Sequence, residues 1–256
     1  MAQTINLACA SIHRREGESV GETGCSSEDL AAALARHGMP LPTNQVECLA
    51  KYCQFLWEWN TKLNLTRHTD LDKFVTRDLR DSLAFSQFLQ PHERILDVGT
   101  GGGVPGVLLA ILRPDLSVTL CESVRKRAQA VADIVQRLGL DVPLLHGRAE
   151  DLLGRPWRFN TLVIRAVARL EQLLRWFRPH WAFFDRMLVL KGPAWVEERA
   201  RARHFGLLRD LALRKLTSYP LARTGSESVL LQICPKERML DRKCCRLTGL
   251  DGPHPN

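Results

Sequence analysis

The feature that most constrains this fold is the alternation of short β-rich runs with helical stretches after Pro91. Strands that alternate with helices form βαβ units, and such units build a mainly parallel sheet. We therefore expect a Rossmann-like α/β fold with a mainly parallel seven-stranded sheet. The expected strands are RILDV at 94–98, SVTLC at 117–121, VPLLH at 142–146, NTLVI at 160–164, MLVLK at 187–191 and two runs at 210–218 and 228–234.

Helices are predicted before this region. Ser27 is expected to be the N-cap of a helix that ends at Gly38, and Thr43 is expected to cap a second helix. A third helix is predicted from about Asp70 to Phe88. We accordingly divide the chain into a disordered extension (1–27), a helical segment (28–90), a cofactor-binding domain (91–234) and a basic flexible tail (235–256).

Composition and charge limit which binding partners and which cellular location we expect. The 256 residues carry a formal net charge of +8, which favours a polyanionic partner, although a basic enzyme with scattered surface arginines fits as well. The sequence offers no run of the roughly 20 apolar residues that a membrane span needs and no secretion signal, so we expect a cytoplasmic protein. The eight cysteines show no metal-ligand spacing, which predicts reduced thiols and no metal.

The loop DVGTGGGVPG at 97–106 follows the first expected strand and contains Gly101-x-Gly103-x-x-Gly106. Glycines at this spacing let a nucleotide cofactor approach the main chain closely. Glu122 lies 21 residues after Gly101, at the end of the second strand, where an acid can hold ribose hydroxyls. Ligands of such sheets bind at the carboxyl ends of the strands, so the loops after 98, 121, 146, 164 and 191 should converge.

Asp97 favours S-adenosylmethionine over NAD, because an acid there would attract a cationic amino group and repel a pyrophosphate. Arg148-Ala149-Glu150 follows the third strand, where an acid could lie beside an adenine edge. Purely structural roles remain open for two of these residues. Asp97 could be a helix-capping carboxylate, and Glu122 could be a solvated strand end.

Several linked motifs carry a family resemblance. They are Trp59-Asn60 with Asn64-Leu65-Thr66, Arg77-x-x-x-Asp81-Ser82, ILDVGTGGGVPG, Arg148-Ala149-Glu150, Arg165-Ala166 and Leu190-Lys191-Gly192. In order and spacing the chain resembles, from about residue 40 to 233, the bacterial 16S ribosomal RNA guanine-N7 methyltransferase family, also called glucose-inhibited division protein B. The resemblance implies a class I methyltransferase fold that transfers the methyl group of S-adenosylmethionine to N7 of one guanine of 16S rRNA.

By matching positions, the resemblance implies cofactor contacts from Gly99, Val104, Ala149, Glu150 and Arg165. Asp97, Gly101, Gly103 and Glu122 complete the cofactor site expected from the glycine loop. Three departures from the family pattern are Asp78 in place of His, Ile164 in place of Ser, and Ser228 near a usual arginine. We expect these changes to affect RNA affinity or target choice more than cofactor binding.

Guanine N7 has an in-plane lone pair and needs no deprotonation, so we expect alignment without a general base. Asp81 is the candidate for positioning the base, with an i,i+4 pair to Arg77 as the alternative. RNA contacts are expected from Arg77, Arg80, Arg165 and Lys191. Trp57 is assigned to the core, and Trp59 is left open between core and base stacking.

Two other functions compete with this interpretation. A NAD-dependent oxidoreductase would be protected by NAD and not by S-adenosylmethionine. A non-catalytic RNA-binding or ribosome-assembly protein on the same fold would bind rRNA without transferring a methyl group. The sequence leaves open whether the substrate is free 16S rRNA or the 30S particle. We expect a monomer, although the sequence does not determine the oligomeric state.

Overall fold

A computed structural model describes residues 25–154, 156–221 and 226–239 of the chain. Its centre is a seven-stranded sheet in the order β3-β2-β1-β4-β5-β7-β6. The strands are β1 (Arg94–Val98), β2 (Ser117–Glu122), β3 (Leu144–His146), β4 (Thr161–Arg165), β5 (Arg186–Lys191), β6 (Leu211–Pro220) and β7 (Glu227–Pro235). The predicted extension (1–27) and tail (235–256) lie outside the described residues at 1–24 and 240–256. In the described part, α1 begins at Ser27, Pro235 ends β7 and Lys236–Met239 form α10, so the tail prediction is wrong for 235–239.

Strands β1 to β5 run parallel to one another, and β7 runs antiparallel to both β5 and β6. The predicted mainly parallel, Rossmann-like sheet is therefore confirmed. Crossover helices connect the parallel strands, whereas β6 and β7 form an antiparallel pair at one edge of the sheet.

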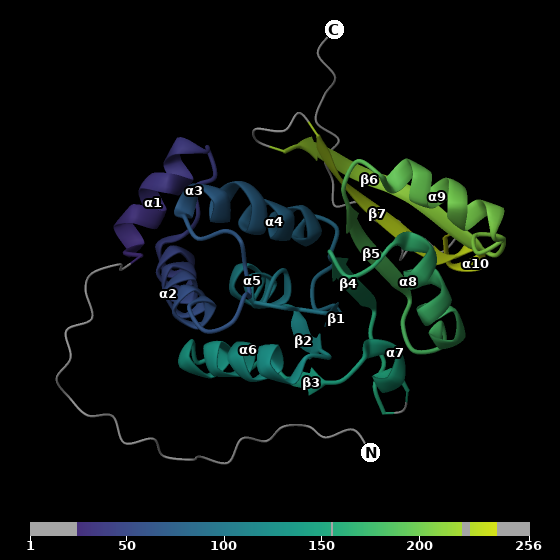
Figure 1. The fold of residues 1–256 in the computed structure, drawn as a ribbon, viewed down its shortest axis with the longest axis horizontal. Helices are drawn as coiled ribbons and strands as arrows, with labels where there is room; N and C mark the ends of the chain where they lie inside the picture. Colours follow the sequence, from purple (N-terminus) through teal and green to yellow (C-terminus); the bar gives the residue numbers. More distant parts are fainter. Residues whose placement is uncertain (1–24, 155, 222–225, 240–256) are drawn as a thin grey trace, which may run out of the picture.

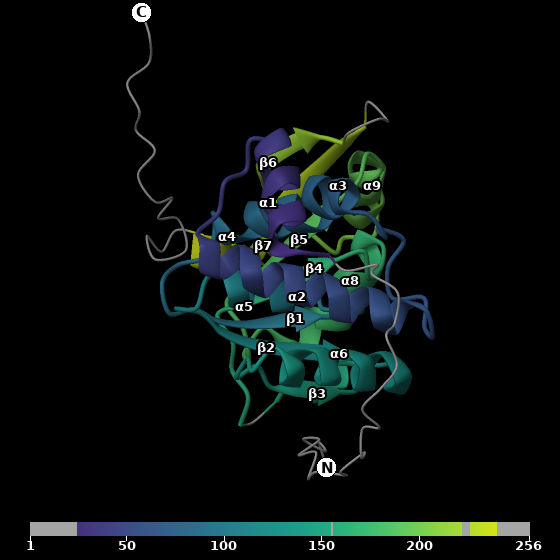
Figure 2. The ribbon, with the colours of Figure 1, turned by 90° about the vertical axis from the view of Figure 1, so that its left-hand side faces the viewer.

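Helices cover both faces of the sheet (Figure 1). Figure 1 shows α5 and α6 on one side and α7, α8 and α9 on the other, and Figure 2 shows α2 lying across the first side. The helices are α1 (Ser27–Arg36), α2 (Thr43–Asn60), α3 (Leu71–Lys73), α4 (Arg80–Ser86), α5 (Gly106–Leu112), α6 (Arg125–Arg137), α7 (Ala149–Leu152), α8 (Leu170–Phe177), α9 (Trp195–His204) and α10 (Lys236–Met239), with short η segments at Phe74–Leu79 and Arg178–His180.

The N-terminal helices begin differently from the prediction. Ser26, and not Ser27, is the N-cap of α1, and it forms a capping box with Asp29. Thr43 is the first residue of α2, whose N-cap, Pro42, makes no side-chain cap hydrogen bond. In both cases the predicted helix exists and its start shifts by one residue, and α1 ends at Arg36, with His37 as its C-cap, instead of at Gly38.

The third predicted helix is interrupted. Asp70 is the N-cap of α3, a π-helical segment spans Phe74–Leu79, and α4 then continues to Ser86. A π-helical turn is wider than an α-helical turn and is frequent at functional sites. The π-helical segment carries Asp78, a residue that is buried, with 2% of its surface exposed.

Two apolar cores flank the sheet. The first joins α1, α2, the Phe74–Leu79 segment and α4 to α5, α6 and one sheet face. The second joins α7, α8 and α9 to the opposite face. Because the N-terminal helices share the first core, they pack directly on the cofactor-binding half of the sheet. Over the described ranges, no helix is long and apolar enough to span a membrane.

Candidate functional site

The carboxyl ends of the parallel strands meet at one edge of the sheet, as predicted. Val98 at the end of β1 is in register with Cys121 of β2 and with Ile164 of β4. Main-chain bonds then join the loops that follow: Thr100 N–H donates to Cys121 O (3.0 Å) and Gly147 N–H to Glu122 O (3.0 Å). The loops after β1, β2 and β3 therefore form one connected surface.

The glycine loop after β1 depends on left-handed backbone conformations. Gly99, Gly101 and Gly103 have φ angles of 67°, 59° and 103°, a region that side chains rarely adopt. A Cβ on Gly103 would also come within 2.7 Å of the Val107 side chain. The loop thus turns tightly at the sheet edge where a nucleotide cofactor would lie, with the N–H groups of Gly101 and Gly103 bonded to Glu122 and Thr100.

Asp97 has a structural role in this loop. It is fully buried, and its Oδ2 accepts a 2.8 Å hydrogen bond from Gly106 N–H at the start of α5. Burial raises its pKa to about 6, with the Gly106 hydrogen bond acting in the opposite direction. The helix-capping alternative considered for Asp97 is therefore confirmed. Because the carboxylate is buried, it is not exposed for the expected attraction of the cofactor's amino group.

Gly106 is required by close approach to Asp97. A Cβ at this position would collide with the Leu120 side chain and would lie 2.5 Å from Asp97 Oδ2. Real Cβ atoms do not approach an oxygen this closely, so only glycine fits between β1, β2 and α5. The last glycine of the motif serves helix–strand packing.

Glu122 is fixed between the glycine loop and α6. Its Oε2 accepts from Gly101 N–H at 3.0 Å, and its Oε1 accepts from Val124 N–H at 2.8 Å. The solvated strand-end alternative is wrong, because Glu122 is only 4% exposed. Each carboxylate oxygen keeps a further lone pair that can accept a hydroxyl.

The remaining predicted cofactor residues border the same edge. Val104 in the glycine loop is half-buried, and Ala149 at the start of α7 is buried. The Glu150 carboxylate pairs with Arg148 at 3.1 Å. The predicted adenosine side thus consists of a small apolar residue beside a paired acid.

Helix α2 holds the glycine loop from the outside. The buried Tyr52 hydroxyl donates to Gly102 O at 2.8 Å, and a Cβ on Gly102 would meet Leu56 at 2.9 Å and Leu65 at 3.6 Å. Asn60 Oδ1 accepts from the N–H groups of Leu65 and Thr66 and so closes the loop that contacts Gly102. The Asn60 and Leu65-Thr66 motifs therefore shape the cofactor loop.

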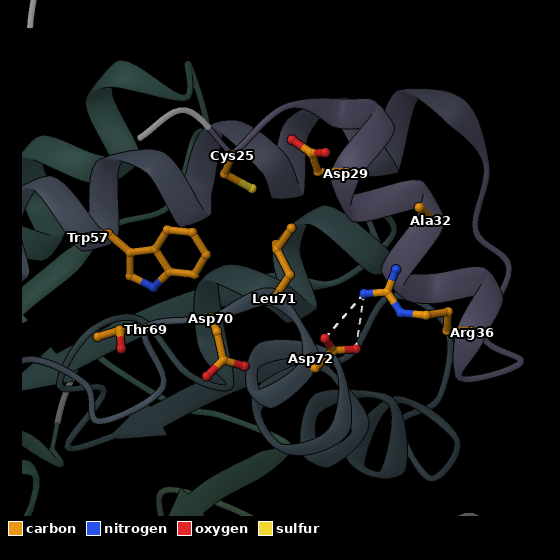
Figure 3. A pocket seen from close by; sticks show the side chains of 9 residues that line it. All are labelled: Cys25, Asp29, Ala32, Arg36, Trp57, Thr69, Asp70, Leu71 and Asp72. Atoms are coloured by element: carbon orange, nitrogen blue, oxygen red, sulfur yellow. Dashed lines mark hydrogen bonds and ion pairs between the residues drawn. The ribbon is translucent and has the colours of Figure 1, made fainter. Parts of the chain in front are cut away.

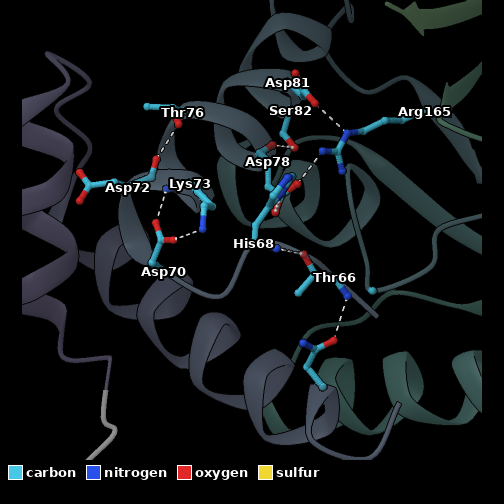
Figure 4. A network of polar contacts seen from close by, with 12 residues as sticks. Thr66, His68, Asp70, Asp72, Lys73, Thr76, Asp78, Asp81, Ser82 and Arg165 are labelled. Atoms are coloured by element: carbon cyan, nitrogen blue, oxygen red, sulfur yellow. Dashed lines mark hydrogen bonds and ion pairs between the residues drawn. The ribbon is translucent and has the colours of Figure 1, made fainter. Parts of the chain in front are cut away.

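Arg165, at the end of β4, forms ion pairs with two carboxylates from the N-terminal segment (Figure 4). Its Nε donates to Asp81 Oδ2 at 2.7 Å and its Nη2 to Asp78 Oδ1 at 2.6 Å. Tyr219 of β6 donates to Asp81 Oδ1 at 2.6 Å, and His68 Nδ1 lies 2.9 Å from Asp78 Oδ2. We call these five residues the Arg165 cluster.

The two carboxylates of the cluster are buried, and this determines its electrostatics. Burial raises the pKa of the Asp81 carboxyl, and the Arg165 charge opposes this shift. Burial alone would lower the pKa of Arg165, but Asp78 and Asp81 outweigh it and raise that pKa. Arg165 therefore stays charged, and Asp81 is a partner of Arg165; the alternative i,i+4 pair between Asp81 and Arg77 does not form.

The other predicted RNA contacts have different environments. Arg80 is half-buried with its guanidinium 5.0 Å from the Tyr219 ring centroid, and Arg77 is half-buried with an Nη1 that has no hydrogen-bond partner among the described residues. Lys191 Nζ binds Ala168 O at 2.6 Å and Glu198 at 2.8 Å. The charge of Lys191 is thus already compensated at the strand end, and its predicted RNA contact stays a prediction.

The two tryptophans of α2 serve packing and hydrogen bonding. Figure 3 shows Trp57 beside Leu71 and Cys25 in a pocket of the N-terminal helices, and its Nε1 donates to His68 O at 2.9 Å. Trp59 Nε1 donates to Asp133 at 2.7 Å. This bond ties α2 to α6, while base stacking by Trp59 remains an open alternative.

The three departures from the family pattern are all buried. Asp78 is 2% exposed, Ile164 is 1% exposed and Ser228 is 7% exposed. Any effect of these three residues on RNA affinity or target choice would therefore act from inside the protein, and that expectation stays a prediction. Asp78 supplies a carboxylate to the Arg165 cluster.

Tyr52, Tyr219 and His68 were missed as site residues. Tyr219 and Asp81 are 138 positions apart, and Tyr52 and Gly102 are 50 apart. Only two tyrosines occur in the chain, and a buried tyrosine hydroxyl needs a partner. That scarcity was the one available signal, but it does not identify the partner.

The residues present fit S-adenosylmethionine. The left-handed glycines form a tight loop at the strand ends, Glu122 retains hydroxyl-accepting lone pairs, and Ala149 is a small apolar residue at the start of α7. The cofactor supplies an electrophilic methyl group on a sulfonium. Across the part of the chain that the structure describes, no group of three or more His, Cys, Asp or Glu is arranged to hold a metal ion.

Comparisons with known proteins agree with this geometry. The family model for rRNA small subunit methyltransferase G matches residues 45–216. A Rhodopirellula baltica protein named ribosomal RNA small subunit methyltransferase G is 49% identical over 199 residues, which cover 78% of this chain and 86% of that protein. A Streptococcus pyogenes protein of the same name is 32% identical and covers 89% and 98%.

A solved O-methyltransferase from Bacillus cereus, in complex with SAH, has a similar fold. Its TM-score is 0.52 at 16% identity, and the match covers 80% of this chain and 97% of that one. This likeness places the fold among class I methyltransferases. With the family match, it shows that the chain is a member of the S-adenosylmethionine-dependent rRNA small subunit methyltransferase G family.

Proposed function

We propose that this protein transfers the methyl group of S-adenosylmethionine to N7 of one guanine of 16S rRNA. The names of the relatives support the RNA class, and the site supports the chemistry. The cofactor would lie against the loops after β1, β2 and β3. Its proposed contacts are Gly99, Gly101, Gly103, Val104, Glu122, Ala149, Glu150 and Arg165, with Asp97 acting through the Gly106 N–H.

One observation carries the proposal: the glycine loop and the Arg165 cluster adjoin at neighbouring strand ends. Val98 and Ile164 are paired in register, so Gly99 and Arg165 follow them on adjacent strands. A Cβ on Gly99 would lie 3.0 Å from Val167, which shows how closely the two loops approach. A base placed between them would face both the cofactor loop and the cluster.

The carboxylates of the cluster suit a reaction without proton abstraction. Asp78 and Asp81 both form ion pairs with Arg165, and the Tyr219 hydroxyl donates a hydrogen bond to Asp81. Guanine N7 attacks with a lone pair that carries no proton, so alignment suffices. A substrate nitrogen or oxygen that must lose a proton would require an acceptor that is less tightly engaged.

The RNA side of the site is proposed to lie next to α4. Arg77 and Arg80 lie on this helical stretch and Arg165 faces it, and the net charge of +8 favours a polyanion. Arg77 offers a buried nitrogen without a partner within the described ranges. We further propose a 30S particle or its precursor as the substrate, a monomer as the acting form, and the cytoplasm as its location.

The test is transfer of labelled methyl from S-adenosylmethionine to 30S particles that lack this modification. Labelled rRNA is expected, with thermal protection by S-adenosylmethionine and none by NAD. Glu122→Gln should weaken S-adenosylmethionine binding, whereas Glu58→Gln, at an exposed ion pair with Arg137, should not. Particle binding without any labelling would favour the non-catalytic alternative, and protection by NAD alone would favour an oxidoreductase.

A further inference from the structure

The Arg165 cluster contains more negative than positive formal charge. One guanidinium faces two carboxylates, at 2.6 Å from Asp78 and 2.7 Å from Asp81. The carboxylate side chains are 3% and 8% exposed, and that of Arg165 is 19% exposed. With one guanidinium between two carboxylates, these three side chains carry a formal excess of one negative charge.

The hydrogen bonds fix the orientation of these charges. Tyr219 and His68 occupy the outer oxygens of Asp81 and Asp78, and Nε and Nη2 of Arg165 occupy the inner ones. Figure 4 shows the third guanidinium nitrogen without a hydrogen bond to the residues drawn. Carboxylates held in this way need no reorganisation when charge develops nearby, and such preorganised groups stabilise it more than mobile ones.

The proposed reaction moves a positive charge toward this cluster. As N7 forms a bond to the methyl carbon, the carbon–sulfur bond breaks with its electron pair remaining on sulfur. The positive charge of the sulfonium thereby passes to the purine, and no proton is transferred. A neutral base becomes a cation, so a negative site lowers the energy of the product-like transition state relative to the ground state.

We propose that Asp78 and Asp81 set a net negative potential on the base side of the site, which favours the cationic 7-methylguanine over neutral guanine. Arg165 orients the base, and the two carboxylates act through their position around it. This inference rests on the proposed function and extends it to specificity. The site would select a ring nitrogen that becomes charged on methylation and disfavour acceptors that stay neutral.

A binding comparison tests this in the unaltered protein. With S-adenosylhomocysteine bound, the protein should bind 30S particles carrying 7-methylguanosine at the target severalfold more tightly than unmethylated particles. Equal or weaker binding of the methylated particles would overturn the inference. This measurement needs no variant, so it holds even if a change in the cluster prevents folding.

Asp78→Asn removes one charge and keeps an acceptor for Arg165. We expect its preference for methylated particles to shrink severalfold and its single-turnover rate to fall about tenfold. Asp78→Glu keeps the charge and should retain most of both. The matched control is Asp72→Asn, which changes an exposed carboxylate paired with Arg36 on the same helical stretch and should alter neither quantity.

A purely structural role would produce a different pattern. Asp78→Asn would then weaken the binding of methylated and unmethylated particles equally. The ratio of the two affinities would stay at the wild-type value, and that result would overturn the inference. Failure of the proposed function is distinguishable, because the wild-type protein would then form no 7-methylguanosine. If the wild-type protein labels the rRNA but Asp78→Asn leaves the ratio of affinities unchanged, the charge inference is contradicted and the proposed function is not.

Discussion

The Tyr52 hydroxyl of α2 donates a 2.8 Å hydrogen bond to Gly102 O in the glycine loop. This bond joins the N-terminal helices to the part of the site that would hold the cofactor. Both partners are buried, so loss of the donor leaves a carbonyl without a partner. The cofactor loop therefore depends on a residue outside the Rossmann-like domain.

Tyr52→Phe should weaken S-adenosylmethionine binding severalfold and lower the free energy of unfolding by about 1–2 kcal/mol. Calorimetric titration and urea unfolding measure the two effects. Trp59→Phe is the matched control, since it removes one hydrogen bond of the same helix to Asp133 of α6. If both variants bind the cofactor as the wild type does, Tyr52 has no role in the loop.

Gly106→Ala should destabilise the protein by about 3 kcal/mol, because its Cβ would collide with Leu120 and Asp97. Gly154→Ala is the control, since a Cβ there meets nothing within 4 Å. Denaturant unfolding of the two variants gives the comparison. Similar unfolding midpoints would contradict the close packing of β1, β2 and α5.

The buried Asp97 carboxyl should make stability depend on pH. Its pKa is raised from an ordinary 3.8 to about 6, so between these values the folded state binds more protons than the unfolded state. The free energy of unfolding should therefore fall as the pH rises from about 4 to 6, by about 3 kcal/mol for this group, and level off above that.

Asp97→Asn retains an acceptor for Gly106 N–H and lacks the titrating group. Its free energy of unfolding in urea, measured from pH 4 to 7.5, should rise relative to that of the wild type as the pH rises through this window. Parallel curves for the two proteins would show that Asp97 does not titrate there.

Arg165→Met leaves Asp78 and Asp81 buried without their cation. We expect a loss of about 3–5 kcal/mol of unfolding free energy, the usual effect of removing one partner of a buried ion pair. Arg158→Met, at an exposed pair with Asp185, should cost less than about 1 kcal/mol. Equal losses in thermal or denaturant unfolding would contradict the buried character of the cluster.

Local patterns predicted most of the fold. Strand runs such as RILDV and MLVLK are apolar and short, and each recurs as β1 or β5. The left-handed glycines and the convergence of strand ends followed from motif spacing and sheet topology. Helix starts shifted by one residue at Ser26 and Thr43, where two adjacent residues could each begin the helix.

Long-range partners were beyond a sequence pattern. Arg165 and Asp78 are 87 positions apart, and nothing local indicates that a departure from the family pattern at 78 points inward. The π-helical segment at Phe74–Leu79 has the same apolar spacing as an α-helix. The role of Asp97 was identified only as an alternative, because a capping acid and a ligand-binding acid occupy the same place in sequence.

The central claim is tested most directly by the chemical identity of the methylated nucleoside. Purified protein, labelled S-adenosylmethionine and unmethylated 30S particles are incubated, and the digested 16S rRNA is analysed by mass spectrometry. The account predicts one labelled methyl per particle, recovered as 7-methylguanosine at a single position. Label in any other nucleoside, or no label where a family relative methylates the same particles, would contradict it.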